Sequence, residues 1–195
     1  MLAFLQQIYS DENRLTAWYR RLAKLTRGLP NDEWLAKMLA SWRCGRGILP
    51  TGIGLEPDVF QYMLIRHFSG IELSDDGGKY IEIDPARKQE LDDINQLLLL
   101  HRAGDDISED WVATIVAAAC MGNDHLWQDV GLWSRRELSA LMESNFPSLF
   151  EKNTGNMKWK RFLYKQLCVQ EGIYTCRSPS CEVCADYEEC FGPEE

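Results

Sequence analysis

The sequence predicts an all-α protein: a multi-helix domain followed by a C-terminal helix and a cysteine-rich metal-binding loop. Apolar residues recur at intervals of three and four, the periodicity of helices with one buried face, and proline or glycine separates the periodic segments. Beyond residue 172, cysteine, serine, proline and acidic residues replace large apolar ones. We therefore expect a helical domain at residues 1–155 and a basic helix with a cysteine tail at residues 156–195, packed as one unit.

The first two helices are predicted by an apolar stripe and by capping residues. Gly28 and Pro30 end a first helix whose stripe is Leu15, Trp18, Tyr19, Leu22 and Leu25. Asn31 or Asp32 is placed to cap a second helix that runs to about Arg43.

Two further helices are expected to begin at proline, which suits the first helical turn. Pro57 opens a helix that carries Phe60, Met63, Leu64 and Phe68. Pro85 opens one that carries Leu91, Ile94, Leu97 and Leu98. Between them, residues 74–83 are expected to form a turn with one short strand.

The remaining helices are predicted from caps and from amphipathic spacing. Ser108 precedes a strongly apolar helix, and Ser134 with Glu137 has the spacing of a capping box. A last helix from about Met157 to Leu167 places Trp159, Phe162, Leu163 and Leu167 on one face and Lys158, Arg161 and Lys165 on another.

Composition and charge exclude several classes of function. The chain has 195 residues, 45% of them hydrophobic, with 21 Lys and Arg against 30 Asp and Glu and a net charge of −9. This charge argues against nucleic acid as a partner. No apolar run approaches the ~20 residues of a membrane span, and residues 1–14 do not read as a signal peptide. We expect a cytoplasmic protein, and cytoplasmic thiols stay reduced.

Four cysteines lie close together near the C-terminus with the spacing Cys-x4-Cys-x2-Cys-x5-Cys: Cys176, Cys181, Cys184 and Cys190. Structural zinc usually takes two Cys-x2-Cys pairs separated by a longer spacer, whereas short gaps let one loop wrap an iron–sulfur cluster. The spacing favours the cluster. A zinc-stabilised interaction module, a redox dithiol and disulfides remain alternatives.

Other residues could contribute to the same site or belong to the core. Cys168, eight positions before Cys176, could supply a fifth thiolate or be a buried structural cysteine. His125 lies in a loop-like segment beside two acids, where it could bind a metal or cap the adjoining helix. Cys44 and Cys120 are interpreted as buried packing residues. His67 and His101 are expected near helix ends, where a positive imidazole is favourable, with no ligand role.

The C-terminal segment "MKWKRFLYKQLCVQEGIYTCRSPSCEVCADYEECFGPEE" resembles the C-terminus of the NifQ family, the nitrogenase molybdenum-accumulation proteins. The segment "NDHLWQDVGLWSRRELSALMESNFPSL" is also similar to that family. The resemblance covers roughly residues 120–195, and the N-terminal half matches only in helical character and length.

The resemblance implies a carrier rather than an enzyme. Such proteins bind an iron–sulfur cluster, of the 4Fe–4S or 3Fe–4S type, that accepts molybdenum and donates it for biosynthesis of the nitrogenase iron–molybdenum cofactor. The family's cysteine motif falls on Cys176, Cys181, Cys184 and Cys190 with none missing. The implied partners are the nitrogenase cofactor-assembly scaffold and the nitrogenase iron protein, with molybdate as the metal source.

Overall fold

A computed structural model describes residues 2–73, 84–170 and 187–193, and within these ranges it contains helices and no strand. The elements are α1 (Leu2–Ala23), α2 (Asp32–Arg43), η1 (Thr51–Gly54), α3 (Pro57–His67), η3 (Pro85–Arg87), α4 (Lys88–Leu100), α5 (Ser108–Cys120), α6 (Leu126–Asp129), α7 (Arg135–Asn145), α8 (Pro147–Lys152), α9 (Trp159–Gln170) and α10 (Tyr187–Phe191). The all-α class is confirmed for this part of the chain. The strand expected in residues 74–83 and most of the cysteine tail lie outside it.

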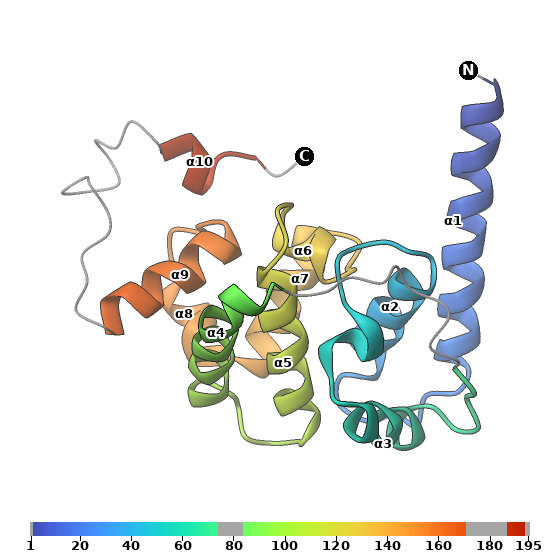
Figure 1. Ribbon diagram of the computed structural model, residues 1–195, viewed down its shortest axis with the longest axis horizontal. Coiled ribbons are helices and arrows are strands. Elements are labelled where there is room, and N and C mark those ends of the chain that lie inside the picture. Colours follow the sequence, from blue (N-terminus) through green and yellow to red (C-terminus); the bar gives the residue numbers. More distant parts are fainter. Residues whose placement is uncertain (1, 74–83, 171–186, 194–195) are drawn as a thin grey trace.

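The helices form two groups that meet at α5 (Figure 1). On one side α1 packs along α2, and the N-terminal part of α1 extends past the rest of the molecule. On the other side α4 packs on α5, α9 packs on α4, and α7 packs on α8. One hydrophobic core runs from Leu15 in α1 to Leu163 in α9, so the last basic helix shares the core of the helical domain.

The helix starts at proline agree with the expectation, with one difference. Pro57 is the first residue of α3, and Phe60, Met63 and Leu64 are buried. Pro85 opens the short 3-10 helix η3, which continues directly into α4.

Asn31 is the residue that precedes α2, as predicted, but neither candidate side chain makes a capping bond, because other polar groups engage both. Asn31 adopts a left-handed conformation (φ 67°), and its amide donates to Ser108 Oγ at 2.9 Å and to Asn145 Oδ1 at 2.7 Å. The Asp32 carboxylate accepts the Leu29 N–H at 2.8 Å and lies 2.6 Å from Nδ1 of the buried His67. These contacts join α2 to α3, α5 and α7 instead of capping a helix.

The capping box at α7 is half confirmed. Ser134 Oγ accepts the Glu137 N–H at 3.2 Å, as the spacing predicts. The Glu137 carboxylate, however, accepts from the N–H of Trp133, one residue before the cap, at 2.8 Å. The two side chains therefore still satisfy two backbone donors at the start of the helix.

Two expectations about single residues, His101 and Cys44, need correction. The surroundings of His101 disfavour a positive imidazole, because burial and the nearby Lys152 charge lower the pKa of the ring. Nδ1 of this ring lies 2.6 Å from Ser148 Oγ. His67 is the last residue of α3, as expected for a histidine near a helix end, and it is fully buried against Asp32. Cys44 is only partly buried, whereas Cys120 is buried as expected.

Candidate metal centre at the start of α9

Of the four clustered cysteines, the structure describes Cys190, while Cys176, Cys181 and Cys184 lie outside the described residues. Cys190 is half-buried in the short helix α10. Its carbonyl oxygen accepts the backbone N–H of Lys158 at 2.8 Å, and the Lys158 ammonium donates to the Glu188 carbonyl at 3.2 Å. The last cysteine of the motif is therefore held against the residue that precedes α9.

The helix α9 starts at Trp159, two residues later than the amphipathic pattern suggests. The Asn153 side chain explains the delay, since its Oδ1 accepts the Met157 N–H at 2.8 Å and its amide donates to the Met157 carbonyl at 3.0 Å. These bonds hold Met157 outside the helix. Trp159, Phe162 and Leu163 are buried as predicted.

A buried ion pair joins the first turn of α9 to α6. The Lys160 ammonium contacts the Asp129 carboxylate and donates to the Gly122 carbonyl at 2.9 Å. The Asp129 side chain is 1% exposed, and it also accepts the Asp124 N–H at 3.1 Å. Burial raises the pKa of the Asp129 carboxyl, and the Lys160 ammonium opposes that rise.

This ion pair, with the bond from Lys160 to Gly122, holds in place the turn at residues 122–124 that leads to His125. A side chain on Gly122 would overlap the Asp129 carboxylate, so the close approach requires glycine. His125 follows the turn as the residue before α6 and forms a capping box with Gln128: its side chain faces the Gln128 backbone N–H, and its own N–H donates to Gln128 Oε1 at 3.2 Å. The start of α9 therefore holds both Cys190, through Lys158, and the turn before His125, through Lys160.

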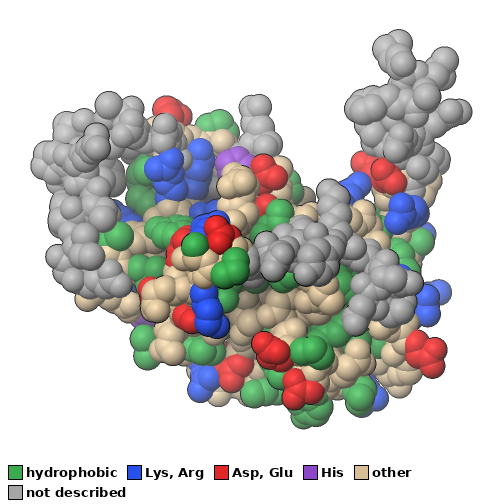
Figure 2. Space-filling view, in the orientation of Figure 1, with side chains coloured by type: hydrophobic (Ala, Val, Ile, Leu, Met, Phe, Trp, Pro, Cys, Tyr) green, Lys and Arg blue, Asp and Glu red, His purple; other side chains and the backbone are tan. Residues whose placement is uncertain are grey.

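The surface around this point is basic, although the whole chain is acidic. Figure 2 shows Lys and Arg side chains gathered over the end of α9 that lies near α10, with a histidine side chain beside them over the start of α6. The sequence there supplies Lys158, Lys160 and Arg161. Such a surface offsets the negative charge of a thiolate-ligated cluster or of an oxyanion.

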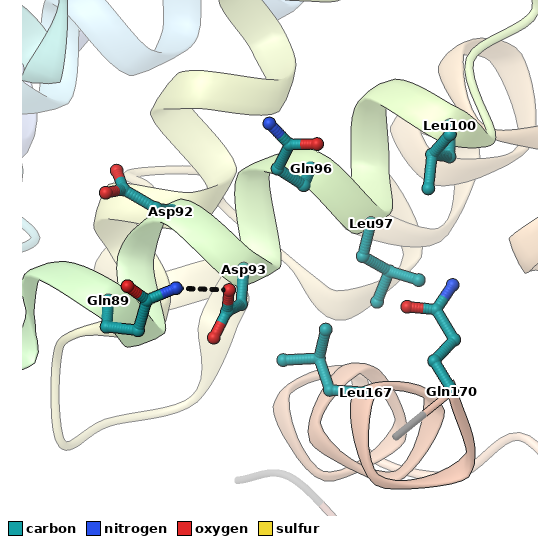
Figure 3. A pocket seen from close by; sticks show the side chains of 8 residues that line it. All are labelled: Gln89, Asp92, Asp93, Gln96, Leu97, Leu100, Leu167 and Gln170. Carbon is teal, nitrogen blue, oxygen red and sulfur yellow. Dashed lines mark hydrogen bonds between the residues drawn. The ribbon is translucent and has the colours of Figure 1, made fainter. Parts of the chain in front are cut away.

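Cys168 lies near the opposite end of α9. Cys168 is nine positions after Trp159, which corresponds to about 14 Å along the helix axis at the ordinary rise per residue. The C-terminal half of α9 instead borders a groove of about 330 Å³ against α4, whose lining in Figure 3 includes Leu97, Leu100, Leu167 and Gln170. The structure thus brings the turn of His125, but not Cys168, to the same end of α9 as Cys190.

Cys120 lies in a separate polar cluster that ties α9 to α4. The Arg87 guanidinium donates to Glu90 Oε1 at 2.6 Å and to the Met121 carbonyl at 2.6 Å, and the Tyr164 hydroxyl contacts Glu90. The hydrogen bond from Arg87 holds the pKa of Glu90 below its usual range. Burial raises the pKa of Cys120 to about 12, so this thiol stays protonated and is a packing residue.

The sequence did not predict the ion pair of Asp129 and Lys160. The signal that points to it is Gly122, which directly follows the apolar run of α5 and leaves room for a carboxylate. Within residues 2–73, 84–170 and 187–193, no group of three or more His, Cys, Asp or Glu side chains is arranged to hold a metal.

Comparison with known proteins gives one consistent family. The NifQ family model matches residues 34–192. The chain is 43% identical over 177 residues to Protein NifQ of Azotobacter vinelandii, covering 84% of this chain and 89% of that protein. It is 35% identical over 173 residues to Protein NifQ of Klebsiella pneumoniae, covering 84% of this chain and 99% of that protein. No solved structure gives a significant match.

Proposed function

Because the chain belongs to the NifQ family, we propose that it serves nitrogen fixation as a molybdenum carrier. In this proposal Cys176, Cys181, Cys184 and Cys190 hold an iron–sulfur cluster that accepts molybdenum. The protein then donates the metal to the scaffold on which the nitrogenase cofactor is assembled, with the nitrogenase iron protein as a further partner. It transfers metal and catalyses no reaction of its own.

The observation that supports the proposal most directly is the position of Cys190. The last cysteine of the motif lies at the start of α9, where Lys160 also fixes the turn before His125. A soft thiolate and an imidazole are thereby brought to the same end of one helix. Thiolates suit iron and sulfide, and an imidazole or oxygen ligand suits an exchangeable position.

The donor set fits an iron–sulfur cluster on chemical grounds. Four thiolates are the usual ligands of such a cluster, which supplies sulfide bridges through which a second metal can be held. The chain's own residues would contribute charge compensation, since Lys158 and Arg161 lie at the start of α9. In the part of the chain that the structure describes, no helix is long and apolar enough to cross a membrane.

Donation of molybdenum tests the proposal as a function. The protein is purified without oxygen from cells supplied with molybdate, mixed with molybdenum-free assembly scaffold and iron protein, and separated again. We expect molybdenum to leave this chain and to appear on the scaffold. Molybdenum that stays on the chain, or a chain that never contains it, would overturn the proposal.

His125 is proposed as the exchangeable molybdenum ligand. The variant His125→Ala is expected to keep its iron and sulfide while the retained molybdenum falls on the order of tenfold, as for other losses at a metal site. The ratio of molybdenum to iron after anaerobic gel filtration measures this. The control is His101→Ala, because His101 bonds Ser148 on α8 and does not border the start of α9. An unchanged ratio in His125→Ala would exclude His125 as the ligand.

A further inference from the structure

The helix α10 is too short to be stable by itself, so its position depends on contacts with the rest of the fold. It spans Tyr187–Phe191, far below the ~12–15 residues at which isolated helices become even marginal in water. Those contacts involve the turn between α8 and α9, at residues 153–158.

That turn is itself rigidly built. Besides the bonds between Asn153 and Met157, the Arg135 guanidinium donates to the carbonyl of Asn156 at 2.7 Å and to its side-chain oxygen at 3.0 Å. Asn156 has a positive φ of 51°, a conformation that these bonds help to hold. Met157 is 7% exposed and belongs to the core. The turn is therefore part of the folded helical domain.

Phe191, next to Cys190, packs on this turn. Its ring lies so close to Gly155 that a Cβ added there would be 3.2 Å from Cε1 of the ring. The same ring packs against the hydrophobic core, and Cys190 beside it is also partly buried. Lys158 is the residue just before α9, and its N–H donates to the Cys190 carbonyl oxygen. A ring contact at Phe191 and a backbone hydrogen bond at Cys190 itself thus fix α10.

We infer that Phe191 is a positioning residue that fixes Cys190 before any metal binds. The inference rests on the proposed function, in which Cys190 is a cluster ligand. A ligand that the fold already holds loses little conformational freedom on binding, so more of the interaction energy appears as affinity. Cys190 is then a ligand of the proposed site whose position the helical domain already sets.

The first part of the test uses metal-free protein and follows hydrogen exchange of the Lys158 amide, which donates to Cys190. In the wild type this amide should be protected. In Phe191→Ala its protection should fall by about tenfold or more, because burial of an aromatic ring contributes free energy on that scale. Phe191→Leu should restore most of the protection. Tyr62→Ala, which removes a ring from the distant helix α3, should leave it unchanged.

A second variant reaches the same contact without altering α10. Gly155→Val places a Cβ 3.2 Å from Cε1 of the Phe191 ring, and its two methyl groups crowd the ring further, so it should also reduce protection of the Lys158 amide. Protection that is equal in the wild type, Phe191→Ala and Gly155→Val would overturn the inference. So would a wild-type amide that exchanges as fast as an unfolded one.

The second part of the test measures uptake of iron and sulfide during anaerobic reconstitution, from the visible absorption. Uptake should be several-fold slower in Phe191→Ala than in the wild type and should recover in Phe191→Leu. Equal rates in the wild type and Phe191→Ala would contradict a role of Phe191 in metal binding. If the wild type takes up no iron and sulfide while the exchange results hold, the proposed function fails and the positioning of α10 by Phe191 stands.

Discussion

Replacing Cys184 with serine is expected to remove most of the molybdenum from the protein while the helical domain stays folded. Loss of a residue that merely orients a metal ligand costs about 10–100-fold in affinity, and loss of a ligand should cost at least as much. The fold should survive, since the core extends from α1 to α9 without needing the tail. The measurement is molybdenum per chain after anaerobic purification, together with the helical circular dichroism signal.

The matched control for this variant is Cys168→Ser. It removes one thiol from the same region, but near the end of α9 opposite to Cys190. We expect it to retain molybdenum. Full loading of Cys184→Ser would exclude this cysteine as a ligand, and loss of loading in Cys168→Ser would show that the tail reaches the far end of α9.

The variant Asp129→Ala is expected to give the largest loss of stability among these substitutions. It leaves the Lys160 ammonium, whose side chain is 16% exposed, without its carboxylate and the Asp124 N–H without its acceptor. Breaking a fully buried ion pair by removing one partner costs about 3–5 kcal/mol, and the partial exposure of Lys160 places this variant at the lower end of that range. Urea denaturation followed by circular dichroism measures the change in the free energy of unfolding.

Two further variants isolate the cause of that loss. Asp92→Ala breaks an exposed pair with Lys88, at 4.0 Å, and should change stability by no more than about 0.5 kcal/mol. Combining Asp129→Asn with Lys160→Met removes both charges and should recover part of the loss, since no unpaired charge stays buried. An effect of Asp129→Ala as small as that of Asp92→Ala would mean that the pair does not hold α6 and α9 together.

Much of the fold could be predicted because local signals and burial agree. Pro57 at the start of α3 and the apolar face of α9 are examples in which one pattern decides the element. The cap of α2 could not be predicted, because Asn31 bonds Ser108 and Asn145, which are distant in sequence. The lowered pKa of His101 likewise depends on burial and on Lys152 from another helix.

The candidate site shows the same division between local and distant information. The spacing of the four cysteines predicts a metal site without any structure, because the ligands are close in sequence. The position of that site relative to the helical domain depends on contacts that no spacing reveals, such as Phe191 on Gly155 and Lys160 on Asp129. The same contacts bring the turn before His125, and not Cys168, to the end of α9 near Cys190. The sequence alone left both residues open as further ligands.

Elemental analysis tests the proposed molybdenum-carrier function most directly. Protein purified without oxygen is analysed for iron, molybdenum, zinc and acid-labile sulfide, and a visible absorption spectrum is recorded on the same sample. We expect brown protein with iron and sulfide in near-equal amounts, and a molybdenum content per chain that rises when the cells receive molybdate. Colourless protein with about one zinc per chain and no sulfide would contradict this function, and the tail would then be an interaction module held by a structural ion.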